Sequence, residues 1–297
     1  MTTSLGELIK FNRTAKGLTQ SNLAEGICTQ ATISNLESKS SLPTISILLQ
    51  ISDKLNIEFD DIYEYTLENT NDYNRIFRQV RELCGKRKHE EAYNLIEKEI
   101  KFDMLETIYD IKQYYYYMGI TSLVGFNRIS DGIYYFNQAL AAESQNSIDF
   151  LDVLSLNGIG IAYFRDNEND EASTYFEQSI EQLDELSSLI DTMKDSLEIS
   201  KIYYNTALFY SKIGKHNKAV NLCSLGIQLL KNENLTYYLE YLLYEKAFNL
   251  MKLNKLKESE KYYLYALVIA DLNDNQQAIE GIKKDMKEYD IQEYKYR

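Results

Sequence analysis

Residues 18–37 read LTQSNLAEGICTQATISNLE, and this stretch decides the fold of the N-terminal part of the chain. Thr19 and Thr29 can each accept a hydrogen bond from the free N–H groups that open a helix. The stretch therefore predicts two short helices that meet at a tight turn, with Gly26 between them. Apolar residues recur at three- and four-residue spacing, which places them on facing stripes. They are Leu23, Ala24, Ile27, Ile33 and Leu36.

The second of these helices has an outer face of short, mostly polar and uncharged side chains. Its residues are Gln30, Ala31, Ser34 and Asn35. Gln and Asn can pair with an adenine edge through two hydrogen bonds, and an alanine methyl can contact a thymine methyl. The composition therefore suits reading of the DNA major groove. A solvated helix face would have the same composition, so from this segment alone both interpretations stand.

The flanking sequence predicts three more helices. Upstream, residues 5–17 have the apolar spacing of a helix and end at a glycine. Downstream, Pro43 opens an amphipathic run through Leu55, and residues 59–65 fit a short last helix.

Five helices in this order resemble the lambda-repressor-like helix-turn-helix domain, of XRE or Cro type. The resemblance runs through LTQSNLAEGICTQATISNLESKSSLPTISILLQISDKLN, where the paired glutamines, the segment ISNLE and the following proline sit in register. It implies that the outer face of the second helix reaches bases, while residues at the start of the preceding helix lie near the phosphate backbone. The implied base contacts are Gln30, Ala31, Ser34 and Asn35, and the implied phosphate contacts are Thr19 and Gln20.

Charge is distributed unevenly along the chain. The formal net charge is −13, from 32 basic and 45 acidic side chains. Residues 1–56 hold five basic and four acidic side chains, so the acidic excess lies elsewhere. A module of charge +1 gains little affinity from counterion release, so a single copy should bind DNA weakly. A homodimer that covers two half-sites is therefore expected.

The composition favours helices throughout and a cytoplasmic location. The 297 residues leave room for two domains and contain one proline. No apolar run approaches the length of a membrane span, and the N-terminus MTTSLGELIK lacks the hydrophobic block of a secretion signal. Cys28, Cys84 and Cys223 are odd in number and form no Cys-x-x-Cys pair. Neither a disulfide framework nor a metal or other cofactor is therefore expected.

The chain repeats itself beyond residues 67–72, LENTND, which form the predicted junction between domains. A small residue near the start of a second helix recurs with spacings of 40, 40, 47 and 40. Periods of this kind indicate an array of helical repeats. The clearest copy is residues 156–183, LNGIGIAYFRDNENDEASTYFEQSIEQL. The five aligned small residues are Ala92, Gly132, Ala172, Ala219 and Ser259.

This pattern resembles the tetratricopeptide repeat over about residues 73–270, with copies longer than the usual 34-residue unit. A last amphipathic helix over about residues 275–289 would cap the open end of the array. The predicted protein is all-α: a helix-turn-helix domain at residues 1–66 is followed by a repeat superhelix at residues 73–297.

The histidines and cysteines have repeat positions that predict packing roles. His89 and His216 each stand three residues before the small residue, in KHEEA and KHNKA, at a position where the repeat consensus has an aromatic residue. Cys84 and Cys223 fall on repeat helices and are predicted to be core. The sequence has no phosphate-binding loop, nucleophile motif or metal-spaced cluster, so no enzyme is predicted.

The first helix of each pair should line the concave face of the array. Asparagine offers both a donor and an acceptor, which suits the backbone of an extended peptide, and aromatic walls would take its side chains. Neither Asn157 nor Asn205 is predicted to fill a packing position. For the tyrosines, packing in the core or between repeats is the alternative. The residues expected on this face are Tyr114, Tyr117, Asn157, Ile161, Phe164, Lys201, Tyr204, Asn205, Tyr241, Tyr244, Glu245 and Phe248.

Both regions together resemble the peptide-sensing Rap/NprR/PlcR/PrgX family of Gram-positive regulators, and PlcR-like members are the most similar in pattern. The segments GLTQSNLAEGIC, ELCGKRKHEEAYN, YFEQSIEQL and YYNTA carry the resemblance. It implies a homodimeric transcription factor that holds a short signalling peptide in the repeat groove, with Asn157 and Asn205 on the peptide backbone. Lys86 and Arg87 are implied partners of the peptide carboxylate. Gly85 stands where a lysine is expected, which suggests a different signal peptide.

Two other functions stay open from the sequence. A Rap-like regulator that acts by binding a protein partner normally lacks DNA-reading residues, so Gln30 and Asn35 argue against it. A repressor that needs no peptide would share every DNA-binding feature. Only a test with a ligand separates the repressor from a peptide sensor.

Overall fold

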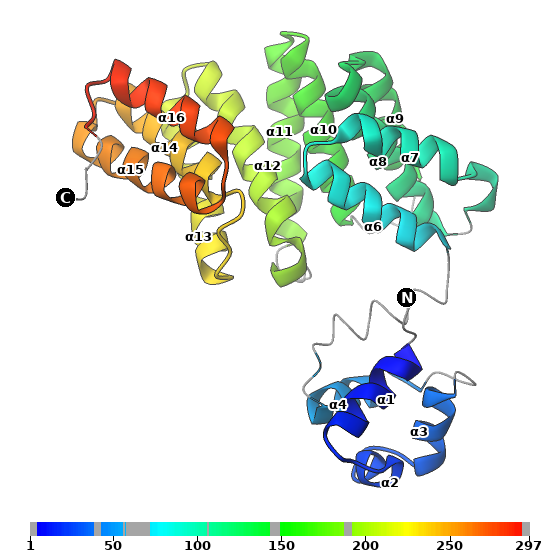
Figure 1. The fold of residues 1–297 in the computed structure, drawn as a ribbon. Coiled ribbons are helices and arrows are strands. Elements are labelled where there is room, and N and C mark those ends of the chain that lie inside the picture. The colour runs from blue at the N-terminus through cyan, green and yellow to red at the C-terminus, as the bar shows by residue number, and fades with distance from the viewer. Residues whose placement is uncertain are drawn as a thin grey trace. The chain divides into compact units, whose positions relative to one another are not determined.

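The computed structural model describes residues 5–38, 43–55, 57, 72–105, 107–142, 149–186 and 192–292. The chain divides into two compact units, residues 1–82 and 83–297. Every regular element of the described residues is a helix, which confirms the predicted all-α class (Figure 1). The predicted helix over residues 59–65 and residues 67–71 of the predicted junction lie outside the described residues.

The first unit is built around one apolar core. Its helices are α1 (Leu5–Ala15), α2 (Gln20–Ala24), α3 (Gln30–Glu37) and α4 (Ile45–Leu55). The predicted facing stripes meet there, because Leu23 and Ile33 are fully buried against α1 and α4. Burial of such side chains stabilises each by about 1.5–3 kcal/mol relative to exposure.

The turn between α2 and α3 follows from local sequence. Thr19 is the N-cap of α2 and forms a capping box with Asn22, and Thr29 caps α3 through the backbone N–H of Thr32. Gly26 has φ +78°, a left-handed backbone conformation that residues other than glycine rarely adopt. Thr19 and Thr29 are therefore two cap positions with a glycine turn between them, as predicted.

The second unit is a row of helix pairs (Figure 1). It begins within α6 (Asp72–Gly85), and successive helices α8 with α9, α10 with α11, α12 with α13 and α14 with α15 pack against each other. The bounds are α7 (His89–Glu99), η1 (Phe102–Met104), α8 (Ile108–Phe126), α9 (Ile129–Ala141), α10 (Phe150–Arg165), α11 (Asn169–Leu186), α12 (Thr192–Lys212), α13 (His216–Asn232), α14 (Leu239–Lys252), α15 (Leu256–Leu272) and α16 (Gln276–Glu288).

The small residues of the repeat lie where helices approach closely. Ala92, Ala172, Ala219 and Ser259 have no exposed surface, and Gly132 is buried. Four residues later along the second helix a fully buried ring fills the adjacent space in three repeats, at Phe136, Phe176 and Tyr263. The final helix α16 buries Ala278, Ile282 and Met286 against α14 and α15. The predicted repeat register and the predicted terminal helix are thus confirmed.

The cysteines are less uniformly buried than predicted. Cys223 is fully buried, but Cys84 is only half-buried, because it lies in the last turn of α6 beside the connection to α7. Burial still raises the pKa of the Cys84 thiol to about 12.

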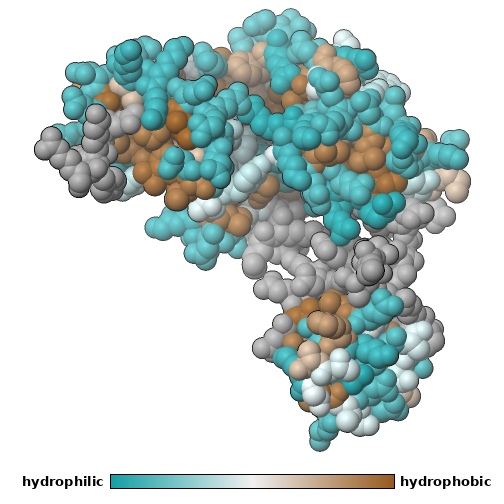
Figure 2. All heavy atoms as spheres, viewed as in Figure 1, coloured by the Kyte–Doolittle hydropathy of each residue, from teal (hydrophilic) through white to brown (hydrophobic). Residues whose placement is uncertain are grey.

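The face of the second unit that Figure 2 shows is mostly hydrophilic, with hydrophobic patches that include one over α15 and α16. Tyr265, Val268 and Leu272 are exposed apolar residues of α15. Within the described residues, no helix is both long enough and apolar enough to cross a membrane.

Candidate DNA-contacting helix and candidate peptide groove

The outer face of α3 is accessible in the way that DNA contact requires. Gln30, Ala31 and Asn35 are exposed and Ser34 is half-buried, while Ile33 and Leu36 point into the core of the unit. At the start of α2, Thr19 is exposed and Gln20 is half-buried beside Gln30. The structure thus brings the six predicted DNA-contacting residues onto α3 and the first turn of α2, as helix spacing requires.

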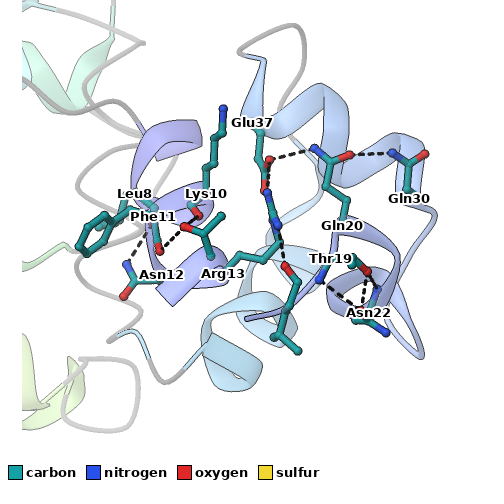
Figure 3. Close-up of polar contacts among 12 residues, drawn as sticks. Leu8, Lys10, Phe11, Asn12, Arg13, Thr19, Gln20, Asn22, Gln30 and Glu37 are labelled. Carbon is teal, nitrogen blue, oxygen red and sulfur yellow. Dashed lines mark hydrogen bonds and ion pairs between the residues drawn. The ribbon is translucent and has the colours of Figure 1, made fainter. Parts of the chain in front are cut away.

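Gln30, Gln20 and Glu37 form a chain of side-chain hydrogen bonds, called here the polar relay (Figure 3). Nε2 of Gln20 donates to Oε2 of Glu37 over 2.9 Å, and Nε2 of Gln30 donates to Oε1 of Gln20 over 2.7 Å. A carboxylate only accepts hydrogen bonds, so the amide nitrogen of Gln20 must face Glu37 and its oxygen must face Gln30. The orientation of Gln30 is fixed in turn, and its own Oε1 is left to accept from a ligand.

The relay ends on a buried ion pair that sequence reasoning missed. Nε and Nη2 of Arg13 donate to the Glu37 carboxylate over 2.5 and 3.0 Å, and Nη1 donates to the carbonyl of Leu18 over 2.6 Å. Burial opposes ionisation of Glu37, but hydrogen bonds from Arg13 and Gln20 outweigh it and lower the pKa of that carboxyl. The hydrogen bond to Glu37 likewise raises the pKa of Arg13. The two residues are 24 positions apart, so no local sequence pattern could identify the pair.

The two predicted groove asparagines contact each other. Nδ2 of Asn205 on α12 donates to Oδ1 of Asn157 on α10 over 3.1 Å. Nδ2 of Asn157 donates to Oγ1 of Thr206 over 3.3 Å. Asn205 is half-buried, whereas Asn157 is only 3% exposed. The prediction that neither residue fills a packing position is therefore wrong for Asn157. Its helix lies in the middle of the row and contacts α8, α9, α11 and α12, so α10 is buried on most sides.

Several other predicted groove residues serve internal packing in this structure. Tyr117 and Glu245 are buried, and Phe164 packs edge-on against Phe209 with ring centroids 5.4 Å apart. The hydroxyl of Tyr244 donates to Asp285 of α16 over 2.8 Å. Burial raises the pKa of Glu245, against hydrogen bonds from Ser211 and Asn249. Half-buried predicted groove residues are Tyr114, Ile161, Phe164, Lys201, Tyr204, Tyr241, Tyr244 and Phe248.

The turn between α6 and α7 meets the last helices of the array. Nη1 of Arg87 donates to Oε1 of Gln277 over 2.7 Å and to the hydroxyl of Tyr241 over 3.4 Å. The hydroxyl of Tyr237 donates to the carbonyl of Gly85 over 2.7 Å. Arg87 and Tyr241, both predicted for the peptide site, are thus neighbours although they are 154 positions apart. Tyr237 and Gln277 carry no repeat signal that could have identified them.

Three basic side chains act on His89, the first residue after this turn. Burial, followed by the charges of Lys201, Arg87 and Arg165, lowers the pKa of His89 to about 4. Nδ1 of His89 is buried without a hydrogen-bond partner. Lys201 is paired with Glu198 over 2.7 Å, while Lys86 is exposed. In the described residues, no group of three or more His, Cys, Asp or Glu side chains could hold a metal ion.

Comparison with known proteins agrees with the fold. Residues 9–62 match the helix-turn-helix family model. The chain is similar to Bacillus thuringiensis PlcR, solved with the peptide PapR7 and DNA, at 23% identity and a TM-score of 0.68, covering 95% of this chain and 99% of that one. It is similar to ComR from S. thermophilus, solved with DNA and its signalling peptide ComS, at 16% identity and a TM-score of 0.58, covering 95% and 98%.

A third similar structure is a putative transcriptional regulator from Listeria monocytogenes, at 13% identity and a TM-score of 0.64, covering 98% of this chain and 100% of that one. No curated protein matches the sequence. At these identities the solved structures establish a shared fold: a helix-turn-helix domain followed by a helical repeat array.

Proposed function

We propose that this chain is a transcription regulator that binds operator DNA as a homodimer and responds to a short signalling peptide held in the concave groove of its repeats. The observation that carries the proposal is the outer face of α3, where Gln30 is exposed and held in one orientation through Gln20 and Glu37. In this proposal residues 1–66 bind DNA, and residues 73–297 bind the peptide and form the dimer.

An oriented glutamine suits base recognition better than a free one. Bidentate pairing with adenine needs one amide N–H and one amide oxygen, and Gln30 keeps both after its bond to Gln20. The orientation is already set before DNA arrives, which reduces the entropy lost on binding. Ala31, Ser34 and Asn35 would extend the same contact along the groove. The near-neutral charge of residues 1–56 supports the need for two copies on DNA.

For the peptide, Asn205 is the better placed of the two asparagines. Both ends of the Asn157 amide are engaged within the protein, whereas Asn205 uses one N–H and keeps its oxygen for a peptide N–H. Arg87, whose hydrogen-bond partners Gln277 and Tyr241 are neutral, would favour the peptide carboxylate, whereas Lys201 is paired with Glu198. PlcR and ComR, which share the fold, were each solved with DNA and a peptide.

The test uses the full chain. A DNA sequence is selected from a random pool by binding, and its affinity is measured by fluorescence anisotropy with and without short synthetic peptides. We expect one palindromic sequence, a complex that sediments with two protein chains, and a change in affinity on addition of one peptide class. Failure to select any sequence would contradict the proposal.

The same measurements separate the alternatives. Sequence-specific binding that no peptide changes would indicate a repressor without a peptide signal. Peptide binding without any selected DNA would indicate a Rap-like regulator that acts on a protein partner.

A further inference from the structure

The turn between α6 and α7 is joined to the far end of the array by three hydrogen bonds. Two come from Nη1 of Arg87, which donates to Gln277 at the start of α16 and to Tyr241 in the first turn of α14. The third runs from the hydroxyl of Tyr237, just before α14, to the carbonyl of Gly85. These contacts join the first helix pair of the array to its last helices.

Arg87 has a backbone conformation that the other repeats assign to asparagine or glycine. Its φ is +61°, in the left-handed region, which an arginine rarely adopts. The residues that follow it at the repeat spacings of 40, 40, 47 and 40 also have positive φ, between +53° and +77°. They are Asn127, Asn167, Gly214 and Asn254. Asparagine and glycine suit this position, where the first helix of each pair ends, and arginine does not.

The exception at Arg87 is explained by its contact with the other end of the array. A residue that is unfavourable for its backbone conformation indicates a role for its side chain. An asparagine at this turn is much shorter and could not make the 2.7 Å hydrogen bond that Nη1 of Arg87 makes to Gln277. Both side chains are exposed, so water competes for this bond and the two ends can separate without unfolding.

The contact engages only one nitrogen of the Arg87 guanidinium. Both of its hydrogen bonds use Nη1, so Nε–H and the Nη2–H groups have no acceptor within the described residues. Nε and Nη2 form one edge of the guanidinium, and such an edge binds a carboxylate through two parallel hydrogen bonds. A ligand carboxylate can therefore bind Arg87 while the hydrogen bond to Gln277 is kept.

We propose that the hydrogen bonds of Arg87 to Gln277 and Tyr241, with that of Tyr237 to Gly85, form a latch that closes the array end to end. A carboxylate bound to Arg87 strengthens the latch, and by linkage the closed array binds that carboxylate more tightly. Gln277 and Tyr241 are then positioning residues for Arg87. That the carboxylate belongs to a signalling peptide rests on the proposed function, whereas the latch itself does not.

Spin labels on the full chain measure whether the two ends are joined. Glu90→Cys on α7 and Glu280→Cys on α16 provide two exposed attachment points. Cys28→Ser and Cys84→Ser remove the half-buried thiols, and Cys223 is fully buried. Pulsed electron double resonance then gives the distribution of distances between the labels. We expect one narrow distribution for this parent chain, because the latch fixes α7 relative to α16.

Two double variants of the labelled parent separate the latch from a general effect of substitution. Arg87→Asn with Tyr237→Phe removes all three hydrogen bonds and introduces the residue that other repeats have at this turn. It should move the distances to longer values and broaden them. The control Lys86→Asn with Tyr265→Phe removes one positive charge and one tyrosine hydroxyl at exposed positions and should leave the distribution unchanged. Melting curves show whether each variant folds.

The effect of the carboxylate is measured with two pools of short random-sequence peptides, one with free C-terminal carboxylates and one with amidated C-termini. Equilibrium dialysis against the unlabelled chain should retain more of the carboxylate pool. Gln277→Ala should reduce this excess about two- to ten-fold, which corresponds to the loss of one neutral hydrogen bond, and should leave retention of the amidated pool unchanged. Gln276→Ala, at the neighbouring exposed glutamine, should change neither.

The outcomes distinguish the latch from the proposed function. Identical label distances in the parent and in the folded variant without the three hydrogen bonds would overturn the latch, and Gln277→Ala in the labelled parent decides it if that variant does not fold. An equal loss of both pools in Gln277→Ala would overturn the coupling to a carboxylate. Retention of neither pool by the wild type would contradict the proposed peptide sensor and the carboxylate coupling together, while the label distances would still decide the latch.

Discussion

Each unit contains a pair of side-chain amides joined by a hydrogen bond, and the two pairs rest on different supports. Gln20 and Gln30 are 2.7 Å apart, and Gln20 is fixed by the buried ion pair of Arg13 and Glu37. Asn157 and Asn205 are 3.1 Å apart, and Asn157 is fixed by the neutral hydroxyl of Thr206.

The difference shows how exposure decides what holds an amide in place. Gln30 is exposed to water, which competes for every hydrogen bond, and the charged end of the relay strengthens its orientation. Asn157 is buried, where water does not compete and a neutral partner suffices. We therefore expect the stability of the first unit to depend on the Arg13–Glu37 ion pair, and the stability of the second unit to depend on the buried amide of Asn157.

The largest effect should come from removing the charge of Glu37, which holds Gln20 of the Gln20–Gln30 pair in place. Glu37→Ala leaves the Arg13 guanidinium buried without its carboxylate, which should lower the free energy of unfolding by about 3–5 kcal/mol. Urea denaturation of the full chain at neutral pH, followed through the first transition, measures it. Glu25→Ala, at an exposed acidic residue of the same unit, should stay within about 0.5 kcal/mol of the wild type.

The double variant Arg13→Met with Glu37→Met shows whether the stability lost in Glu37→Ala comes from the unpaired charge or from lost packing. Because it removes both charges and keeps apolar volume, it should recover most of the lost stability. It should not restore the orientation of Gln20, since methionine cannot accept the amide hydrogen bond in the same way. A loss as large as that of Glu37→Ala would mean that packing, rather than an unpaired charge, dominates.

Local features of the fold could be predicted, and pairings across the chain could not. The caps at Thr19 and Thr29 depend on residues three positions away, and the repeat register depends on one small residue per copy. The helix starts and the array therefore follow from spacing alone. Asn157 and Thr206 are 49 positions apart, and Arg87 and Gln277 are 190 apart. Such contacts depend on how far successive pairs rotate, which periodicity does not specify.

The second prediction compares the two asparagines. Asn157→Ala removes a buried amide and leaves the partner on Asn205 unsatisfied, so it should lower the free energy of unfolding by about 1–3 kcal/mol. Asn205→Ala, at a half-buried site, should cost less stability yet weaken binding of an identified peptide by a similar amount. Melting curves and calorimetry measure the two quantities. Equal peptide affinity for Asn205→Ala and the wild type would remove Asn205 from the proposed peptide site.

The third prediction concerns the exposed end of the first pair. Gln30→Ala should weaken binding to the selected operator by about 1–3 kcal/mol, while binding to unrelated DNA should hardly change. Stability should be nearly unaffected, because Gln30 is exposed. Anisotropy titrations on both DNAs at one salt concentration provide the measurement. Equal losses on both DNAs would show that Gln30 does not read a base, however well the relay orients it.

The smallest expected effect concerns His89, whose Nδ1 is buried without a hydrogen-bond partner. The polar relay of the first unit ends on a matched ion pair, whereas Nδ1 of His89 lies buried without a partner, near Arg87 and Lys201. The folded pKa of His89 is about 4, below its ordinary value of 6.5. As pH falls from 6.5 towards 4, the unfolded chain binds a proton that the folded chain does not. Folding should therefore weaken over this window.

The size of the His89 contribution should be about 1 kcal/mol or less, because the ring is only half-buried and solvent screens the neighbouring charges. The midpoint of urea unfolding, measured across this window, should fall less steeply in His89→Gln than in the wild type. His216→Gln is the matched control, because His216 has the same repeat position but contacts Asn249 through Nδ1 over 2.8 Å. Parallel pH profiles for His89→Gln and the wild type would show that the ring is solvated, and that the cations of this region do not act on it as the structure implies.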